Sequence, residues 1–131
     1  MTGHERASEW RRFAEGDLKS ARVLLKEELF NEVCFHSQQC IEKLLKSILV
    51  QHGKQVPKTH RLVDLLEEVL RKGNRWESLR DRCAILDQYY IPSRYPDAVI
   101  GSKPTGLPSL QDAREALEIA EAIWSAIAKG R

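Results

Sequence analysis

Apolar residues recur at intervals of three and four along most of the chain, which is the spacing that places them on one face of an α-helix. The first such run predicts an amphipathic helix over about residues 8–28. The second run, from Val33 to Leu49, carries apolar residues on two adjacent faces. So broad an apolar arc fits both a helix at the centre of a bundle and one that also reaches a subunit interface.

Residues that end or begin helices separate a third helix from the second. Gly53 is a favourable C-cap, and Pro57 excludes continuation because proline lacks the N–H that an inner helical turn needs. Thr59 is a good N-cap for the third helix, and Gly73 ends it. We therefore expect this helix to begin directly after Thr59.

Two more helices complete the predicted fold. Asn74 and Glu77 have the spacing of a capping box, which opens a fourth helix that Pro92 stops. The last helix starts near Ser109, and no alternating pattern predicts a strand. The fold class is therefore all-α, an up-and-down bundle of four long helices plus a short fifth.

Residues 91–108 form a long connection that contains four of the five prolines and two of the seven glycines. Loops of this length inside a compact domain are uncommon, and they are usually either functional or disordered. Ile91 and Tyr95 offer apolar anchors that a free linker would not need. We expect the loop to be ordered and to belong to one domain spanning residues 1–131.

The composition is that of an ordinary globular protein, with 131 residues, 42% hydrophobic and 31% charged. No apolar run approaches the roughly 20 residues that a membrane-spanning helix needs, and the first residues lack the apolar stretch of a secretory signal. We expect a cytoplasmic protein without a membrane partner. Its three cysteines, Cys34, Cys40 and Cys83, form no C-x-x-C pair and are expected to be buried thiols.

The net charge of +2 is too small to indicate nucleic-acid binding by itself, but the basic residues are unevenly distributed. No acidic residue lies between positions 43 and 61. The basic residues of this stretch are Lys43, Lys46, Lys54, Lys58 and Arg61. Two interpretations fit: a solvated helix end and loop, or a surface that contacts phosphate.

Two further groups of residues suggest anion binding. His60 is predicted at a helix start, where N–H groups face an anion; the alternative is a structural residue of the cap. Arg94 lies among tyrosines that include Tyr95, and arginine holds a phosphate with two hydrogen bonds while an aromatic ring stacks on a base. The alternative is that Arg94 pairs with Asp97 or Asp87 to fix the loop. No spacing typical of a metal site, a P-loop or a hydrolase nucleophile is present, so we expect neither metal nor cofactor.

Four motifs follow one another along the chain. They are W-x-x-x-A-x-x-D-L-x-x-A from Trp10, F-x-x-Q-Q-x-x-E-K-x-L-K from Phe35, T-H-x-L from Thr59 and S-R-Y-P-D over residues 93–97. In order and spacing this set resembles the HEPN domain family. The resemblance implies a helical bundle, commonly a homodimer, in a prokaryotic cytoplasmic protein. It also implies nucleotide binding and, for many members, pairing with a minimal nucleotidyltransferase as a toxin and antitoxin.

Many members of that family are metal-independent ribonucleases with an R-x(4–6)-H motif, and this chain departs from it. The positions at that distance after Arg94 are Val99, Ile100 and Gly101, and no other arginine has a histidine at the required spacing. The sequence therefore predicts a non-catalytic homodimer that binds nucleotide or RNA phosphates, docks a nucleotidyltransferase, or does both. The candidate binding residues are Lys43, Lys46, Lys58, His60, Arg94, Tyr95 and Asp97.

The alternative is a ribonuclease toxin with a non-standard active site. RNA cleavage without metal needs a base for the 2′-hydroxyl and a cation for the charge that develops on the phosphate. Arg94 supplies the cation in this alternative, and His60 is the candidate for the base.

Overall fold

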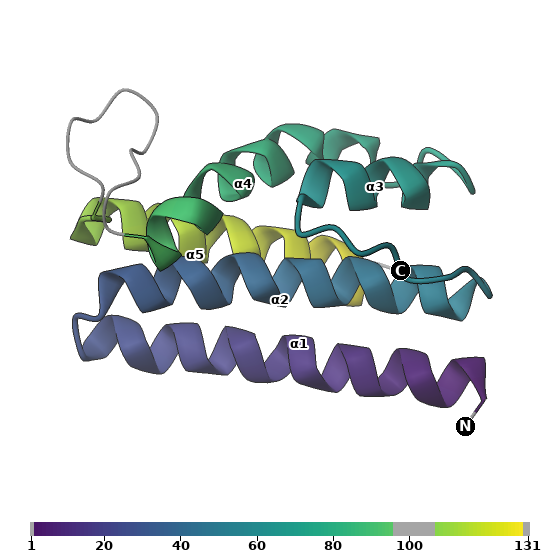
Figure 1. Cartoon of the computed structure of the whole chain (residues 1–131), viewed down its shortest axis with the longest axis horizontal. Helices are drawn as coiled ribbons and strands as arrows, with labels where there is room; N and C mark the ends of the chain where they lie inside the picture. Colours follow the sequence, from purple (N-terminus) through teal and green to yellow (C-terminus); the bar gives the residue numbers. More distant parts are fainter. Residues whose placement is uncertain (1, 96–106, 130–131) are drawn as a thin grey trace.

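The computed structural model describes residues 2–95 and 107–129, and all the regular secondary structure in this part of the chain is helical. The prediction of an all-α bundle is therefore confirmed (Figure 1). Its elements are α1 (Gly3–Lys26), α2 (Phe30–Gln51), α3 (Leu62–Leu70), a 3₁₀ turn (Glu77–Leu79), α4 (Arg80–Arg94), α5 (Leu110–Trp124) and a π-helical turn (Ser125–Lys129).

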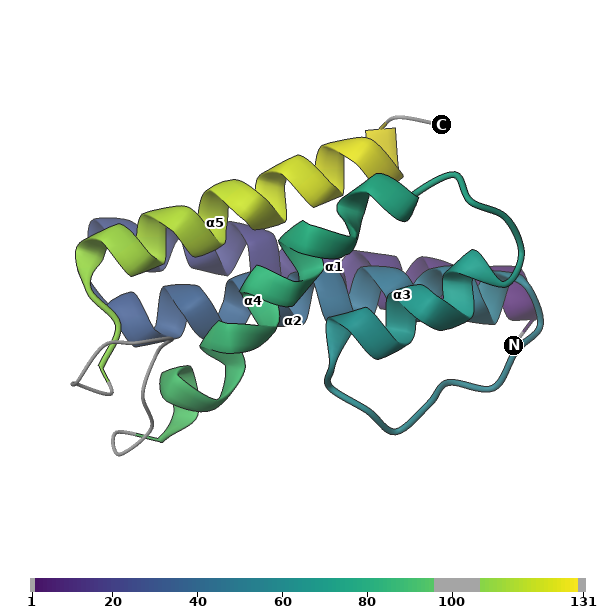
Figure 2. The same ribbon diagram turned by 90° about the horizontal axis from the view of Figure 1, so that it is seen from above.

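The centre of the bundle is α2, which packs against each of the other four helices. The four longest helices, α1, α2, α4 and α5, alternate in direction, whereas α3 runs parallel to α2 (Figures 1 and 2). This is possible because residues 52–61 lead the chain back along α2 before α3 begins. The broad apolar arc of α2 is thus covered within the bundle.

One hydrophobic core extends along the helices. Its largest fully buried side chains include Leu18, Ile41, Leu45, Leu66 and Ile123. The three cysteines are thiols buried in this core, as predicted. No helix among the described residues is both long and apolar enough to cross a membrane.

Two predicted helix starts were wrong. The N-cap residue of α3 is Arg61 rather than Thr59, whose hydroxyl oxygen accepts only the N–H of Arg61. Asn74 does not open α4, which begins at Arg80 after the 3₁₀ turn. At α3 the first N–H groups bond to the carboxylate of Asp87 instead. After Asn74, the N–H of Glu77 bonds to the backbone carbonyl of Asn74 and forms a turn ahead of α4. Ser109, in contrast, is the N-cap of α5, with a reciprocal capping box to Asp112.

The predicted stop at Pro92 was also wrong, since α4 continues to Arg94. Proline removes one N–H, and near the end of a helix this loss is small because the last residues are already weakly bonded. The backbone N–H of Tyr95 bonds to the carbonyl of Ile91 at 3.0 Å and closes the final turn. Ile91 and Tyr95 are both about half exposed, so neither is the buried anchor that was expected. Asp97 and most of the predicted loop lie outside the described residues.

Candidate functional site

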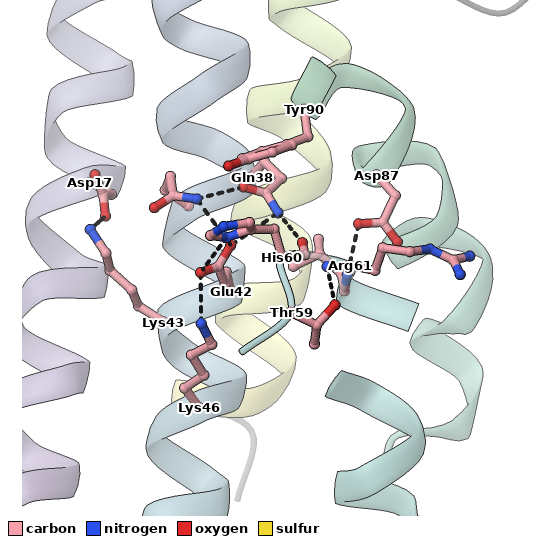
Figure 3. Close-up of polar contacts among 12 residues, drawn as sticks. Asp17, Gln38, Glu42, Lys43, Lys46, Thr59, His60, Arg61, Asp87 and Tyr90 are labelled. Atoms are coloured by element: carbon pink, nitrogen blue, oxygen red, sulfur yellow. Dashed lines mark hydrogen bonds and ion pairs between the residues drawn. The ribbon is translucent and has the colours of Figure 1, made fainter. Parts of the chain in front are cut away.

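A buried carboxylate lies at the middle of α2. Glu42 contacts the ammonium group of Lys46 at 2.9 Å, the side-chain nitrogen of Gln39 at 3.0 Å, and Nδ1 of His60 at 3.0 and 3.2 Å (Figure 3). A buried charge is tolerated only when it is paired and hydrogen-bonded, and Glu42 meets both conditions. Its contact with Nδ1 favours the imidazole form that carries a proton there.

His60 lies in the segment that returns along α2, not at the start of α3. Its backbone carbonyl accepts a hydrogen bond from the side chain of Gln38 at 2.7 Å, and its ring stacks on Tyr90 of α4. Even so, 58% of its side chain is exposed. With Nδ1 held by Glu42, Nε2 is the ring nitrogen left for a ligand.

Arg94, in the last turn of α4, shares the same aromatic ring. Its guanidinium carbon lies 5.6 Å from the ring centroid of Tyr90 and 5.4 Å from that of Phe35. Its Nη1 donates to the Tyr90 hydroxyl at 3.3 Å. Asp87 is not the partner of Arg94 that was considered, because its carboxylate binds the backbone at the start of α3. We call His60, Tyr90 and Arg94, with Glu42 beneath His60, the His60–Arg94 site.

The two lysines of α2 are already paired with carboxylates of the bundle. Lys46 is 7% exposed, pairs with Glu42 and lies over the ring of Trp10. Lys43 points toward α1, where it pairs with Asp17 at 2.6 Å (Figure 3). Both are therefore neutralised by carboxylates within the bundle, Lys43 by Asp17 and Lys46 by the Glu42 that also contacts His60. Lys58 and Tyr95 are both exposed; Lys58 lies two residues before His60, and Tyr95 directly follows Arg94.

Comparison with known proteins gives the family. The HEPN domain model matches residues 7–130, nearly the whole chain. The chain belongs to the HEPN domain family. The crystal structure of ST0689, an archaeal HEPN homologue, is similar to this chain, with 30% sequence identity and a TM-score of 0.73. The match covers 95% of this chain and 96% of ST0689.

Two further proteins resemble this HEPN chain. The crystal structure of TT1696 from Thermus thermophilus has a TM-score of 0.82 and 30% identity, and covers 96% of this chain and 98% of that one. A Methanocaldococcus jannaschii protein named "Putative toxin MJ1304" is 29% identical over 123 residues, covering 87% of this chain and 80% of its own length.

Sequence reasoning overlooked the HEPN residues that hold the site together. Gln38 and Glu42 were given only as letters of the motif that begins at Phe35, and Tyr90 was not among the candidate binding residues. A signal was available, since polar residues at i and i+4 lie on one side of a helix that is otherwise apolar there. Within residues 2–95 and 107–129, no group of three His, Cys, Asp or Glu side chains is placed to hold a metal ion.

Proposed function

We propose that this HEPN protein binds RNA or a nucleotide through phosphate contacts at the His60–Arg94 site. The observation that carries the proposal is that His60 and Arg94 lie against one aromatic ring, so two donors come from separate parts of the chain to one place. An arginine fork matches two phosphate oxygens, and Nε2 of His60 donates a further hydrogen bond when the imidazole carries a proton on both nitrogens. Among the described residues, the contacts of Arg94 are to aromatic groups rather than to a carboxylate.

Aromatic side chains beside these donors suit the base of a nucleotide. Tyr95 follows Arg94 directly and is 53% exposed, which leaves its ring open to stacking. Stacking of a base on an aromatic ring contributes about 1–3 kcal/mol and tolerates any sequence. Because the net charge of the chain is only +2, we expect affinity to depend on this site rather than on a broad basic surface.

The test is fluorescence anisotropy of a labelled single-stranded RNA, with ATP as competitor, at low salt. Arg94→Ala is expected to weaken binding of both ligands by at least tenfold, about 1.4 kcal/mol. Arg12→Ala is the matched control, because Arg12 is also exposed and lies over an aromatic ring, that of Phe13 on α1. Equal binding by wild type and Arg94→Ala, or no binding by wild type, contradicts the proposal.

A second candidate function is cleavage of RNA without a metal, and the contact between Glu42 and His60 favours it. In this reaction Nε2 of His60 takes the proton of a 2′-hydroxyl, and the 2′-oxygen forms a bond to phosphorus. The bond from phosphorus to the 5′-oxygen breaks, that oxygen is protonated by solvent, and a 2′,3′-cyclic phosphate remains. Arg94 stabilises the charge on the phosphate oxygens. The relative named as a toxin is consistent with such an activity.

Cleavage is tested on a denaturing gel with end-labelled RNA in the presence of a chelator. His60→Ala and Arg94→Ala are each expected to abolish cleavage if the site is catalytic, whereas Arg12→Ala leaves it unchanged. Intact RNA with the wild-type protein, together with measurable binding, leaves the non-catalytic function standing and removes the enzymatic one.

We also propose that the protein is a cytoplasmic homodimer and pairs with a nucleotidyltransferase as its antitoxin. The family resemblance and the relative named as a toxin support the proposal. The face of α1 that carries Phe13, 58% exposed, is available to a second subunit. Light scattering at tens of micromolar tests the dimer, and co-purification with a co-expressed minimal nucleotidyltransferase tests the pair. A monomeric wild type contradicts the first claim.

A further inference from the structure

Asp87 of α4 caps a helix to which it does not belong. Its Oδ1 accepts the N–H of Leu62 at 2.7 Å and its Oδ2 accepts the N–H of Val63 at 3.1 Å. The first N–H groups of a helix have no partner within the helix, and the N-cap residue of α3, Arg61, provides no side-chain cap. Asp87 therefore supplies the cap that Thr59 was expected to give.

These contacts hold the chain directly after His60. Asp87 and Tyr90 are three residues apart on α4, so they lie on neighbouring parts of one helix face. The first binds the backbone two and three positions after His60, and the second stacks on the His60 ring. From the other side, Gln38 of α2 binds the carbonyl of His60 itself. The backbone around His60 is thus fixed between two helices (Figure 3).

Partial burial of the Asp87 carboxylate disfavours its charged form, so this cap costs free energy of desolvation. Desolvation raises the pKa of Asp87, and the bonds from the Leu62 and Val63 N–H groups act in the opposite direction. A hydroxyl or amide in the chain before α3 would satisfy the same N–H groups without burying a charge. What the cap from α4 adds is a link between the segment that carries His60 and the helix that carries Tyr90 and Arg94.

We propose that Asp87 is a positioning residue of the His60–Arg94 site, which keeps His60 against Tyr90 and in register with Arg94. The inference rests on the proposed function, because a displaced His60 matters to a ligand only if the ligand binds there. Asp87 itself touches no ligand. Its carboxylate binds the backbone N–H groups of Leu62 and Val63, and these bonds hold the His60 imidazole against Tyr90 of α4.

The experiment uses Asp87→Ala and Asp87→Asn in the full chain, and it reads the position of His60 separately from RNA binding. Stacking on Tyr90 places the His60 ring protons in the ring current of the phenol, which shifts their NMR signals upfield. We expect Asp87→Ala to lose this shift and to raise the RNA Kd by about tenfold, or about 1.4 kcal/mol. Asp87→Asn retains one acceptor oxygen, so both effects are expected to be smaller.

Val69→Ala is the matched control for a general loss of stability. Val69 is buried in the last turn of α3, so its truncation loosens the packing of the helix without touching the cap. It should lower Tm and leave the His60 signals in place. The positioning role is overturned if the His60 ring protons keep the wild-type upfield shift in both Asp87→Asn and Asp87→Ala. It is also overturned if Val69→Ala loses the shift to the same extent as the Asp87 variants. Loss of the shift in the Asp87 variants, with no RNA binding by the wild type, supports positioning and rejects the proposed function.

Discussion

The imidazole of His60 lies parallel to the ring of Tyr90, with centroids 5.0 Å apart and planes inclined by 19°. One residue comes from the segment between α2 and α3, and the other from the second half of α4. Because Arg94 lies against the same tyrosine, one aromatic side chain sets the relative positions of both proposed phosphate donors. The geometry of the site therefore depends on Tyr90 more than on either His60 or Arg94.

This dependence predicts different outcomes for two substitutions of Tyr90. Tyr90→Phe keeps the ring and loses only the hydroxyl that accepts from Arg94 at 3.3 Å, so RNA affinity should remain within about twofold, about 0.4 kcal/mol. Tyr90→Leu removes the surface on which both His60 and Arg94 rest, and affinity should fall by about tenfold. Anisotropy titrations of the two variants provide the measurement. Wild-type affinity in Tyr90→Leu would contradict the role of the ring.

The buried charges beneath the site predict a large effect on stability. The side chains of Glu42 and Lys46 are 5% and 9% exposed. Removing one member of such a pair leaves the other charged and buried, so Glu42→Ala should lower the free energy of unfolding by about 3–5 kcal/mol. Lys46→Met should cost less, because His60 and Gln39 still contact Glu42. Urea unfolding measures both values, and an equal or larger loss in Lys46→Met would show that Glu42 depends on Lys46 alone.

The sequence predicted the long helices well because their signal is periodic and extends over many residues. The arc over Val33–Leu49 correctly required neighbours on two sides, and in α2 those neighbours are helices of the same bundle. The last helix was predicted to start near Ser109, and Ser109 is its N-cap, bonded to Asp112 three residues away in the same helix. Even contacts within one helical turn were not all predicted correctly, because Asn74 and Glu77 have the same spacing and do not open α4.

The candidate site was predicted less well because its contacts join residues far apart in the sequence. Nothing near Thr59 reveals that the cap of α3 comes from Asp87, 25 positions beyond Leu62. Similarly, Lys43 and Lys46 were grouped with His60 because they belong to one basic stretch. In the fold, Asp17 of α1 neutralises the first and Glu42 the second. Charge along the sequence does not show which charges are already paired.

A hydroxyl in the core predicts a stabilising substitution. Among the described residues, the Oγ of Ser37 on α2 is a buried side-chain oxygen with no hydrogen-bond partner. Burial of an unpaired hydroxyl is unfavourable, and alanine is the better helix former, so Ser37→Ala should raise the free energy of unfolding by about 1 kcal/mol. Urea unfolding again provides the value. Destabilisation by a similar amount would show that the hydroxyl makes a contact in solution.

The buried thiols predict how stability changes at alkaline pH. Burial raises the pKa of the Cys83 thiol from 9.0 to about 12, and it also raises that of Cys40. The folded protein therefore keeps these protons at a pH where the unfolded chain has lost them. Since stability changes with pH by the difference in bound protons between the two states, the contribution of these thiols should be constant below about pH 8 and fall between about pH 9 and 12. In Cys83→Ala the fall should be shallower.

Melting temperatures of the two proteins from pH 7 to 11 measure this effect, and a thiol reagent at pH 8 provides an independent check. Cys34, Cys40 and Cys83 are all buried, so none should react within minutes in the folded protein, and all three should react in denaturant. Rapid labelling of one thiol in the native state would show that the core opens at that cysteine. In that case the raised pKa does not hold at the labelled position, so the decline of stability should end closer to pH 9 and be smaller.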